Sequence, residues 1–176
     1  MLLLIKFLSQ IFALFNGEVS KKQIGAGYAY GAIIGLMPVA GIFPLFLTLL
    51  SFIINFNLPA VGLAILVTKI QSFFVDPLSN YIGYTLLVKI PALKGFWTTL
   101  YNLPIVPYTK FNNTLVLGSF VFGVLSIIPN FFFMFWVVEL YRTRFRDKVQ
   151  QFKIVQIVKA SSFYKYYLTF RKIKGE

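Results

Sequence analysis

Long apolar stretches, separated by short polar segments, dominate the pattern of this chain. Residues 24–56 contain no Lys, Arg, Asp or Glu, and neither do residues 114–138. A transmembrane helix requires about 20 consecutive apolar residues, and 114–138 meets that requirement. The pattern therefore predicts an all-α membrane protein whose clearest transmembrane helix occupies 114–141, with a kink at Pro129.

The first apolar stretch is too long for one crossing and is interrupted in its middle. As a single helix, 24–56 would measure about 50 Å, whereas the hydrocarbon core of a bilayer is about 30 Å thick. Pro38 removes a backbone donor and Gly41 permits a turn, so both are predicted helix breaks. Each remaining arm would be about 21 Å long and too short to cross alone. We expect a re-entrant or broken helix hairpin over 21–56.

The segments around these stretches complete the expected fold. Residues 1–16 are apolar but too short to span, which predicts a helix lying in the membrane interface. Asn57 is a predicted N-cap for a transmembrane helix over 58–88, which Pro77 should interrupt. The connector 89–113 is rich in Trp and Tyr, as is typical of membrane interfaces, and should contain a short surface helix.

Composition and charge support this interpretation and predict an orientation. Hydrophobic residues make up 58% of the chain and charged residues 12%, against about 45–50% and about 25% in soluble domains. The net charge is +12, but the basic tail 142–176 adjoins an apolar run, which favours anionic lipid headgroups over nucleic acid as its partner. By the positive-inside rule this tail is cytoplasmic, and the topology places the N-terminus on the same side. The predicted membrane-surface anchor consists of Arg142, Arg144, Arg146 and Lys148.

The residue inventory gives little support to enzyme chemistry. The chain contains no cysteine and no histidine, which excludes disulfides, thiol nucleophiles and acid–base catalysis by histidine, and leaves no basis for a zinc site. No two acidic residues are close enough in sequence to suggest a catalytic carboxylate pair. We therefore predict no catalytic residue, no metal ligand and no cofactor.

Three glycines four residues apart form a predicted helix-packing face. Gly27, Gly31 and Gly35 lie on one side of an apolar helix, where another helix backbone can approach closely. The competing interpretation is that glycine is simply common in membrane helices. We favour packing because the repeat is sustained over three positions.

Two charged residues interrupt the apolar helix predicted over 58–88. Lys69 lies about 15 Å along that helix, near the middle of the membrane, where charges are costly and usually functional. Asp76 has two interpretations: it belongs to a polar site, or it caps the half-helix that begins at Pro77. The predicted intramembrane polar patch comprises Lys69, Gln71, Ser72, Asp76 and Asn80.

The order of these motifs resembles a bacterial membrane family catalogued as domain of unknown function 2062. The resemblance extends over about residues 20–141, and a narrower branch of the family is similar in the connector as well. It is carried by Gly31, Gly35-Leu36-Met37-Pro38, Gly41, Asn57-Leu58-Pro59-Ala60 and Asp76-Pro77-Leu78, and for the branch by Gly95-Phe96-Trp97, Leu100-Tyr101-Asn102 and Phe111-Asn112-Asn113-Thr114.

The resemblance implies a small protein of the bacterial inner membrane and brings no established activity. Members of the narrower branch tend to be encoded beside a large periplasm-facing protein similar to the AsmA-like lipid-transfer family. The first functional hypothesis is therefore a non-enzymatic membrane subunit, in a hetero-oligomer with such a protein, that takes part in phospholipid transport. The alternative is a small transporter or channel with a polar site at the broken helices.

Overall fold

The computed structural model describes residues 2–17, 19–39 and 41–146, with side chains from Ser9 onward, and all regular secondary structure in these ranges is helical. The all-helical prediction is therefore confirmed. The α-helices are α1 Leu2–Asn16, α2 Lys21–Leu36, α3 Ile42–Ile53, α4 Leu58–Tyr84, α5 Lys94–Tyr101, α6 Thr114–Leu125 and α7 Ile127–Leu140. Short π-helical turns follow α4 over Thr85–Lys89 and α7 over Tyr141–Phe145, and single 3-10 turns cover Pro91–Leu93 and Val106–Thr109.

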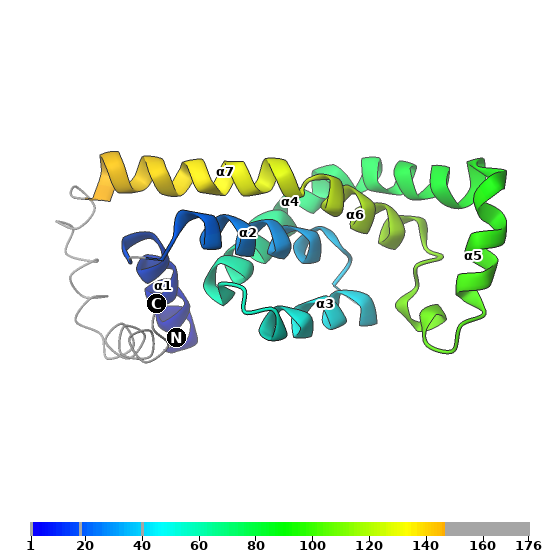
Figure 1. The fold of residues 1–176 in the computed structure, drawn as a ribbon, viewed down its shortest axis with the longest axis horizontal. Coiled ribbons are helices and arrows are strands. Elements are labelled where there is room, and N and C mark those ends of the chain that lie inside the picture. The colour runs from blue at the N-terminus through cyan, green and yellow to red at the C-terminus, as the bar shows by residue number, and fades with distance from the viewer. Residues whose placement is uncertain (1, 18, 40, 147–176) are drawn as a thin grey trace.

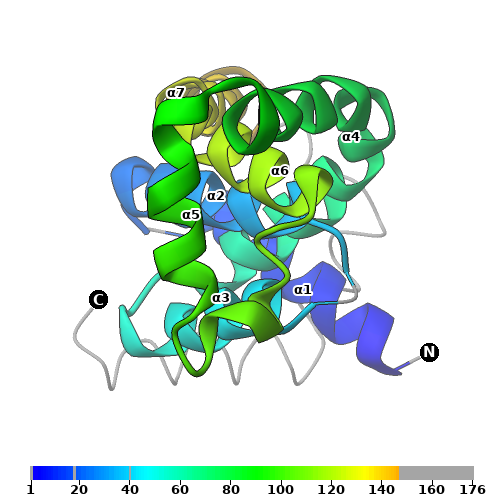
Figure 2. The same ribbon diagram turned by 90° about the vertical axis from the view of Figure 1, so that its right-hand side faces the viewer.

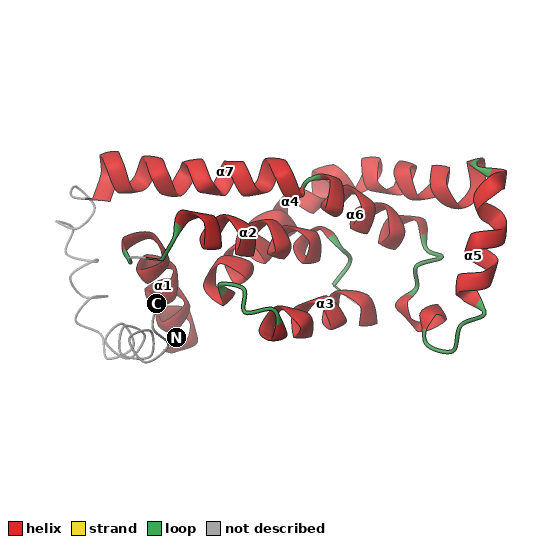
Figure 3. Cartoon of the chain, in the orientation of Figure 1, coloured by secondary structure: helices red, strands yellow, loops and turns green. Residues whose placement is uncertain are grey.

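The helices form an elongated bundle with two helices across its ends. Helices α2, α6 and α7 run along the long axis of the molecule, and α3 lies beneath α2 (Figure 1). Helix α1 crosses one end and α5 crosses the other, and Figure 2 shows α5 upright in a view along the long axis. Short loops join most of the helices (Figure 3).

Three helices begin at side chains that cap their first turns. Ser20 Oγ accepts a hydrogen bond from the Lys22 N–H at 3.3 Å, and Asn57 Oδ1 accepts from the Ala60 N–H at 3.1 Å. Asn113 Oδ1 accepts from the N–H groups of the first turn of α6, at 2.9 and 3.2 Å. Such acceptors satisfy donors that have no partner inside the helix, so they set where α2, α4 and α6 start.

The first apolar stretch is broken where the sequence predicts. Met37, with ψ 153°, is extended because the ring of Pro38 disfavours helical backbone in the residue before it. Helix α3 then folds back beneath α2, and the Tyr30 hydroxyl donates to the Leu47 carbonyl at 2.7 Å to hold the two together. With 16 and 12 residues, α2 and α3 are about 24 and 18 Å long, each shorter than a membrane core.

The predicted interruption at Pro77 is wrong. Helix α4 is 27 residues long and continues through Pro77, which lies in its interior. Proline deletes one backbone hydrogen bond, whereas ending the helix would leave several carbonyl and amide groups without partners. Asp76 therefore lies within a helix and caps nothing.

The last predicted helix bends as expected, but the bend separates two helices instead of kinking a single one. Helices α6 and α7 meet at Ser126 and are bent by 54°. Pro129 stands in the first turn of α7, where a missing N–H is tolerated. Its ring is incompatible with a helical carbonyl four residues earlier, at Leu125, which is the last residue of α6. Pro129 therefore ends α6 at a residue that precedes the proline by four positions.

The packing of α4 inverts the usual distribution of residues in a soluble protein. Its buried positions are mostly small or hydroxylated, whereas large apolar side chains are exposed. Phe73 and Phe74 are 80% and 78% exposed, and Ile70 is 73% exposed. Within the described ranges, Leu58–Lys89 is long and apolar enough to cross a membrane, and the bent pair α6–α7 passes the same test if it acts as one span.

Candidate functional site

The glycines of α2 face the first half of α4. A Cβ atom placed on Gly31 would lie 2.5 Å from the Val61 carbonyl oxygen and 2.8 Å from the Ala64 Cβ, and one on Gly27 would lie 3.0 Å from the Asn57 carbonyl oxygen. A Cβ on Gly35 would meet the backbone of Ile65 at 2.8 Å. Side chains at these positions would separate the helices, so the glycine face sets the approach of α2 to α4.

A second close crossing, between α4 and α6, was missed by the sequence analysis. A Cβ on Gly118 would lie 2.8 Å from the Gly83 backbone nitrogen, and a Cβ on Gly83 would meet the backbone of Thr114. The signal was present as two small residues four apart on each helix, Ser79 with Gly83 and Thr114 with Gly118. It is easily overlooked because only one member of each pair is glycine.

Lys69 is bound to the end of α2. Its Nζ donates to the Met37 carbonyl at 2.7 Å and lies 3.4 Å from the Gly35 carbonyl oxygen. These carbonyls have lost their helical donors because α2 ends before Pro38. A cation at this place also faces the negative end of the helix dipole. Lys69 therefore stabilises the loop that connects α2 to α3.

The predicted polar patch is not a single cluster. Ser72 Oγ donates to the Lys69 carbonyl at 2.9 Å, whereas Asp76 forms no salt bridge among the described residues. Asn80 accepts a hydrogen bond from the Thr114 hydroxyl and so belongs to the crossing with α6. Gln71 points elsewhere, into a groove.

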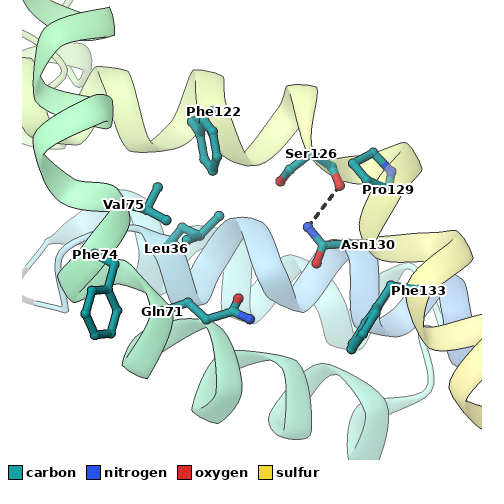
Figure 4. A pocket seen from close by; sticks show the side chains of 9 residues that line it. All are labelled: Leu36, Gln71, Phe74, Val75, Phe122, Ser126, Pro129, Asn130 and Phe133. Atoms are coloured by element: carbon teal, nitrogen blue, oxygen red, sulfur yellow. Dashed lines mark hydrogen bonds between the residues drawn. The ribbon is translucent and has the colours of Figure 1, made fainter.

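That groove lies at the break between α6 and α7 and has a volume of about 470 Å³ (Figure 4). Its lining residues come from α4, α6, α7 and the turn between α6 and α7, with Leu36 from α2. Two amides point into it, those of Gln71 and Asn130, and the Asn130 Nδ2 donates to the Ser126 carbonyl at 2.9 Å. The remaining lining residues are Phe74, Val75, Phe122, Ser126, Pro129 and Phe133.

The groove has an apolar lining with two amide side chains. A mostly apolar wall with a few polar groups is typical of small-molecule sites. Its lining contains no acid and no base, and its amides offer hydrogen bonds to a neutral or polar group. Among the described residues no group of three His, Cys, Asp or Glu side chains is placed to hold a metal ion.

Two residues of the predicted membrane-surface anchor also make hydrogen bonds within the protein. Arg142 donates to the Phe15 and Leu14 carbonyls at 3.1 and 3.3 Å, and Arg146 donates to the Asn16 carbonyl at 3.3 Å. Both guanidinium groups bind the C-terminal carbonyls of α1, which favour cations. Arg144 is exposed, and Lys148 lies outside the described residues.

The same end of the molecule contains further polar contacts between distant segments. Asn16 Nδ2 donates to the Tyr141 hydroxyl at 3.0 Å, and the ring of Tyr141 packs edge-on against Phe15 at 5.3 Å. Lys21 forms a salt bridge with Glu139, which accounts for the acid at the end of α7. Helix α1 and the start of α2 are thereby fixed to the end of α7.

Comparison with known proteins identifies the family. The family described as "Uncharacterized protein conserved in bacteria (DUF2062)" matches residues 6–147. The chain therefore belongs to this family, as its motifs indicate. A protein of Treponema pallidum (strain Nichols), described as an uncharacterized protein, is 24% identical over 159 residues, which cover 89% of this chain and 96% of that protein. No solved structure matches the chain.

Proposed function

We propose that this chain is a non-enzymatic integral protein of the bacterial inner membrane, and that its large exposed apolar side chains face lipid. The inverted packing of α4 is the observation that carries this proposal. On the described surface, Phe73, Phe74 and Ile70 are each more than 70% exposed, whereas soluble monomers rarely expose large contiguous apolar patches. Helices associate in lipid through small residues, as at Gly31 and Gly118.

The hydrogen bonds of polar side chains support the same environment. The hydroxyls of Thr48, Thr68, Ser119 and Ser126 all donate to carbonyls three or four residues earlier in their own helices. A hydroxyl in lipid has no water to bind, so bonding to its own helix is the available way to satisfy it.

The two ends of the bundle supply the proposed membrane surfaces. Helices α1 and α5 lie across opposite ends, as interfacial helices do (Figure 1). The α1 end carries more basic residues, Lys21, Lys22, Arg142, Arg144 and Arg146, than the α5 end, with Lys89, Lys94 and Lys110. The positive-inside rule then assigns the α1 end to the cytoplasm. In this arrangement α4 and the α6–α7 pair span, and α2–α3 forms a re-entrant hairpin.

In the first functional proposal, the protein passes phospholipid to a large AsmA-like envelope protein. The groove at the α6–α7 break supports it, because an apolar groove with a few amides suits the junction between acyl chains and a polar headgroup. The partner comes from the family resemblance rather than from any feature of the described surface.

The alternative is a small transporter or channel. The same groove favours it, because it lies beside a helix break, and broken helices often form substrate sites in transporters. Its two amides, Gln71 and Asn130, would then bind the solute directly.

Purification from native membranes in a mild detergent distinguishes the two. The first proposal predicts a heteromer with a large periplasm-facing protein, retained by wild type and by the connector variant Asn102→Leu as a control. It also predicts no solute flux from the chain alone in liposomes. Flux by the isolated wild-type chain, lost in Gln71→Leu and retained in Asn102→Leu, would overturn the first proposal in favour of the second.

A further inference from the structure

A second hollow, with a volume of about 390 Å³, lies between α2 and α7 and shares no lining residue with the groove. One wall contains Ala26, Ala29 and Ile33 of α2, and the opposite wall contains Ile128, Phe131 and Phe132 of α7. The whole lining surface is apolar. Two alanines on one wall and branched or aromatic side chains on the other leave a space that the protein itself does not fill.

The hollow opens onto the exposed apolar surface of α7. Ile128 is 68% exposed and Phe132 is 56% exposed, although both also line the hollow. If this surface faces lipid, as the proposed function requires, the hollow is continuous with the acyl chains around the protein. A lipid chain can therefore reach it laterally.

A basic residue precedes the hollow along α2. Lys22 is exposed and lies four and seven residues before Ala26 and Ala29. The helical period places all three on one side of α2, with Lys22 about 6 Å along the axis from Ala26. Its neighbour Lys21 is already paired with Glu139. Lys22 therefore offers a positive charge on the membrane-surface side of the apolar hollow.

We propose that this hollow binds one acyl chain of a glycerophospholipid whose anionic headgroup is held by Lys22. The site rests on the proposed membrane location, and it adds a specific lipid-binding position distinct from the α6–α7 groove. A lipid chain is the occupant that the wall admits. A peptide segment would bring N–H and C=O groups that this lining cannot satisfy, whereas an acyl chain brings none.

The experiment uses the full chain in liposomes that contain a phosphatidylglycerol with a photoreactive acyl chain. After irradiation, mass spectrometry measures adducts on the α7 peptide containing Phe131 and Phe132, relative to adducts on the α4 peptide containing Phe73 and Phe74. The α4 peptide reports general contact with lipid. Adducts on the α7 peptide in excess of the α4 level report the hollow.

Two substitutions fill the hollow from opposite walls. Ala29→Phe fills it from α2, and Ile128→Trp fills it from an exposed position that tolerates a larger side chain. Either variant that assembles should lose the excess of α7 adducts while keeping those on α4. Ala92→Phe, at an exposed alanine near α5, is the matched control and should leave the ratio unchanged.

A charge variant tests the headgroup. Lys22→Gln should weaken labelling of the α7 peptide about fivefold, as expected for loss of one lysine at an anionic headgroup. Lys94→Gln, at an exposed lysine on α5, should not change it. Equal labelling of α7 in wild type, Ile128→Trp and Lys22→Gln, with α4 still labelled, would overturn the site while leaving the membrane location intact. Absence of labelling on α4 as well would contradict the proposed function.

Discussion

Gly83 of α4 and Gly118 of α6 meet backbone to backbone, so that a Cβ on Gly118 would lie 2.8 Å from the Gly83 nitrogen. Neither glycine has the left-handed backbone that often demands this residue. Their role is to let two helices approach more closely than any side chain allows. This crossing joins the long helix to the segment that ends at the α6–α7 break, and so it fixes one side of the groove.

Replacing Gly118 with alanine should therefore destabilise the protein. The added Cβ meets backbone atoms, which cannot rotate away, and overpacking of this kind costs about 1–3 kcal/mol or more. Thermal unfolding in detergent should show a lower midpoint for Gly118→Ala than for wild type. Gly95→Ala is the matched control, because a Cβ there has nothing within 4 Å. Equal midpoints for the two variants would contradict the close crossing.

Two fully buried serines should respond to alanine in opposite directions. Ser79 Oγ has no hydrogen-bond partner among the described residues, whereas Ser119 Oγ donates to the Leu115 carbonyl at 2.6 Å. Ser79→Ala removes an unsatisfied polar group and should raise stability by about 1 kcal/mol. Ser119→Ala removes a hydrogen bond and should lower it by about 0.5–1.5 kcal/mol. Chemical unfolding in mixed micelles measures both, and a loss of stability in Ser79→Ala would show that its hydroxyl is bound.

The role of Lys69 can be separated from that of Asp76. Lys69→Met should lower stability by about 1–3 kcal/mol, because the carbonyls at the end of α2 lose their donor in a partly buried place. Asp76→Asn should cost less, since Asp76 caps no helix and forms no salt bridge among the described residues. Thermal unfolding of the two variants side by side checks the order. A larger loss in Asp76→Asn would restore a structural role for that carboxylate.

Arg142 should hold α1 in place. Arg142→Gln removes charge-assisted hydrogen bonds to the carbonyls of Leu14 and Phe15, each worth about 1.5–3 kcal/mol. Hydrogen exchange of the amides in residues 9–17 should become faster in this variant. Arg144→Gln changes an exposed arginine of the same turn and should leave exchange unaltered. If both variants exchange alike, α1 is held by its apolar contacts alone.

The local features of the fold were predictable from sequence, whereas the contacts between distant segments were not. Ser20, Asn57 and Pro38 act on their own turns, so their effects follow from neighbouring residues. The different effects of Pro38 and Pro77 do not follow from neighbouring residues, because both prolines remove one backbone donor. At Pro38 the chain turns, and Lys69, 32 residues away, binds the freed Met37 carbonyl. No pattern in the neighbouring residues predicts such a distant partner.

Several residues of the candidate site were predicted from sequence, but their grouping in space was not. Lys69 and Ser72 lie together as the helical period requires, but Gln71 is on another face and belongs to a groove formed with α6 and α7. Asn130 was not considered, since an amide in an apolar helix gives no sign of which helix it will face. The contacts of Arg142 and Arg146 with the carbonyls of α1 could not be predicted, because those carbonyls lie more than 120 residues earlier, and the lipid-anchor role of these arginines stays a prediction.

The proposal that exposed apolar side chains face lipid can be tested directly, because the chain contains no cysteine. Single cysteines would be placed at Phe73, which is 80% exposed, and at the exposed connector residue Asn102. Both variants would be treated with a membrane-impermeant maleimide in native vesicles that have been opened, so that the reagent reaches both faces of the membrane, and again after unfolding in detergent. The account predicts that Asn102→Cys reacts readily in the vesicles, while Phe73→Cys reacts only after unfolding. Equal reaction of both cysteines in intact membranes would show that water covers the α4 surface, and would contradict the account.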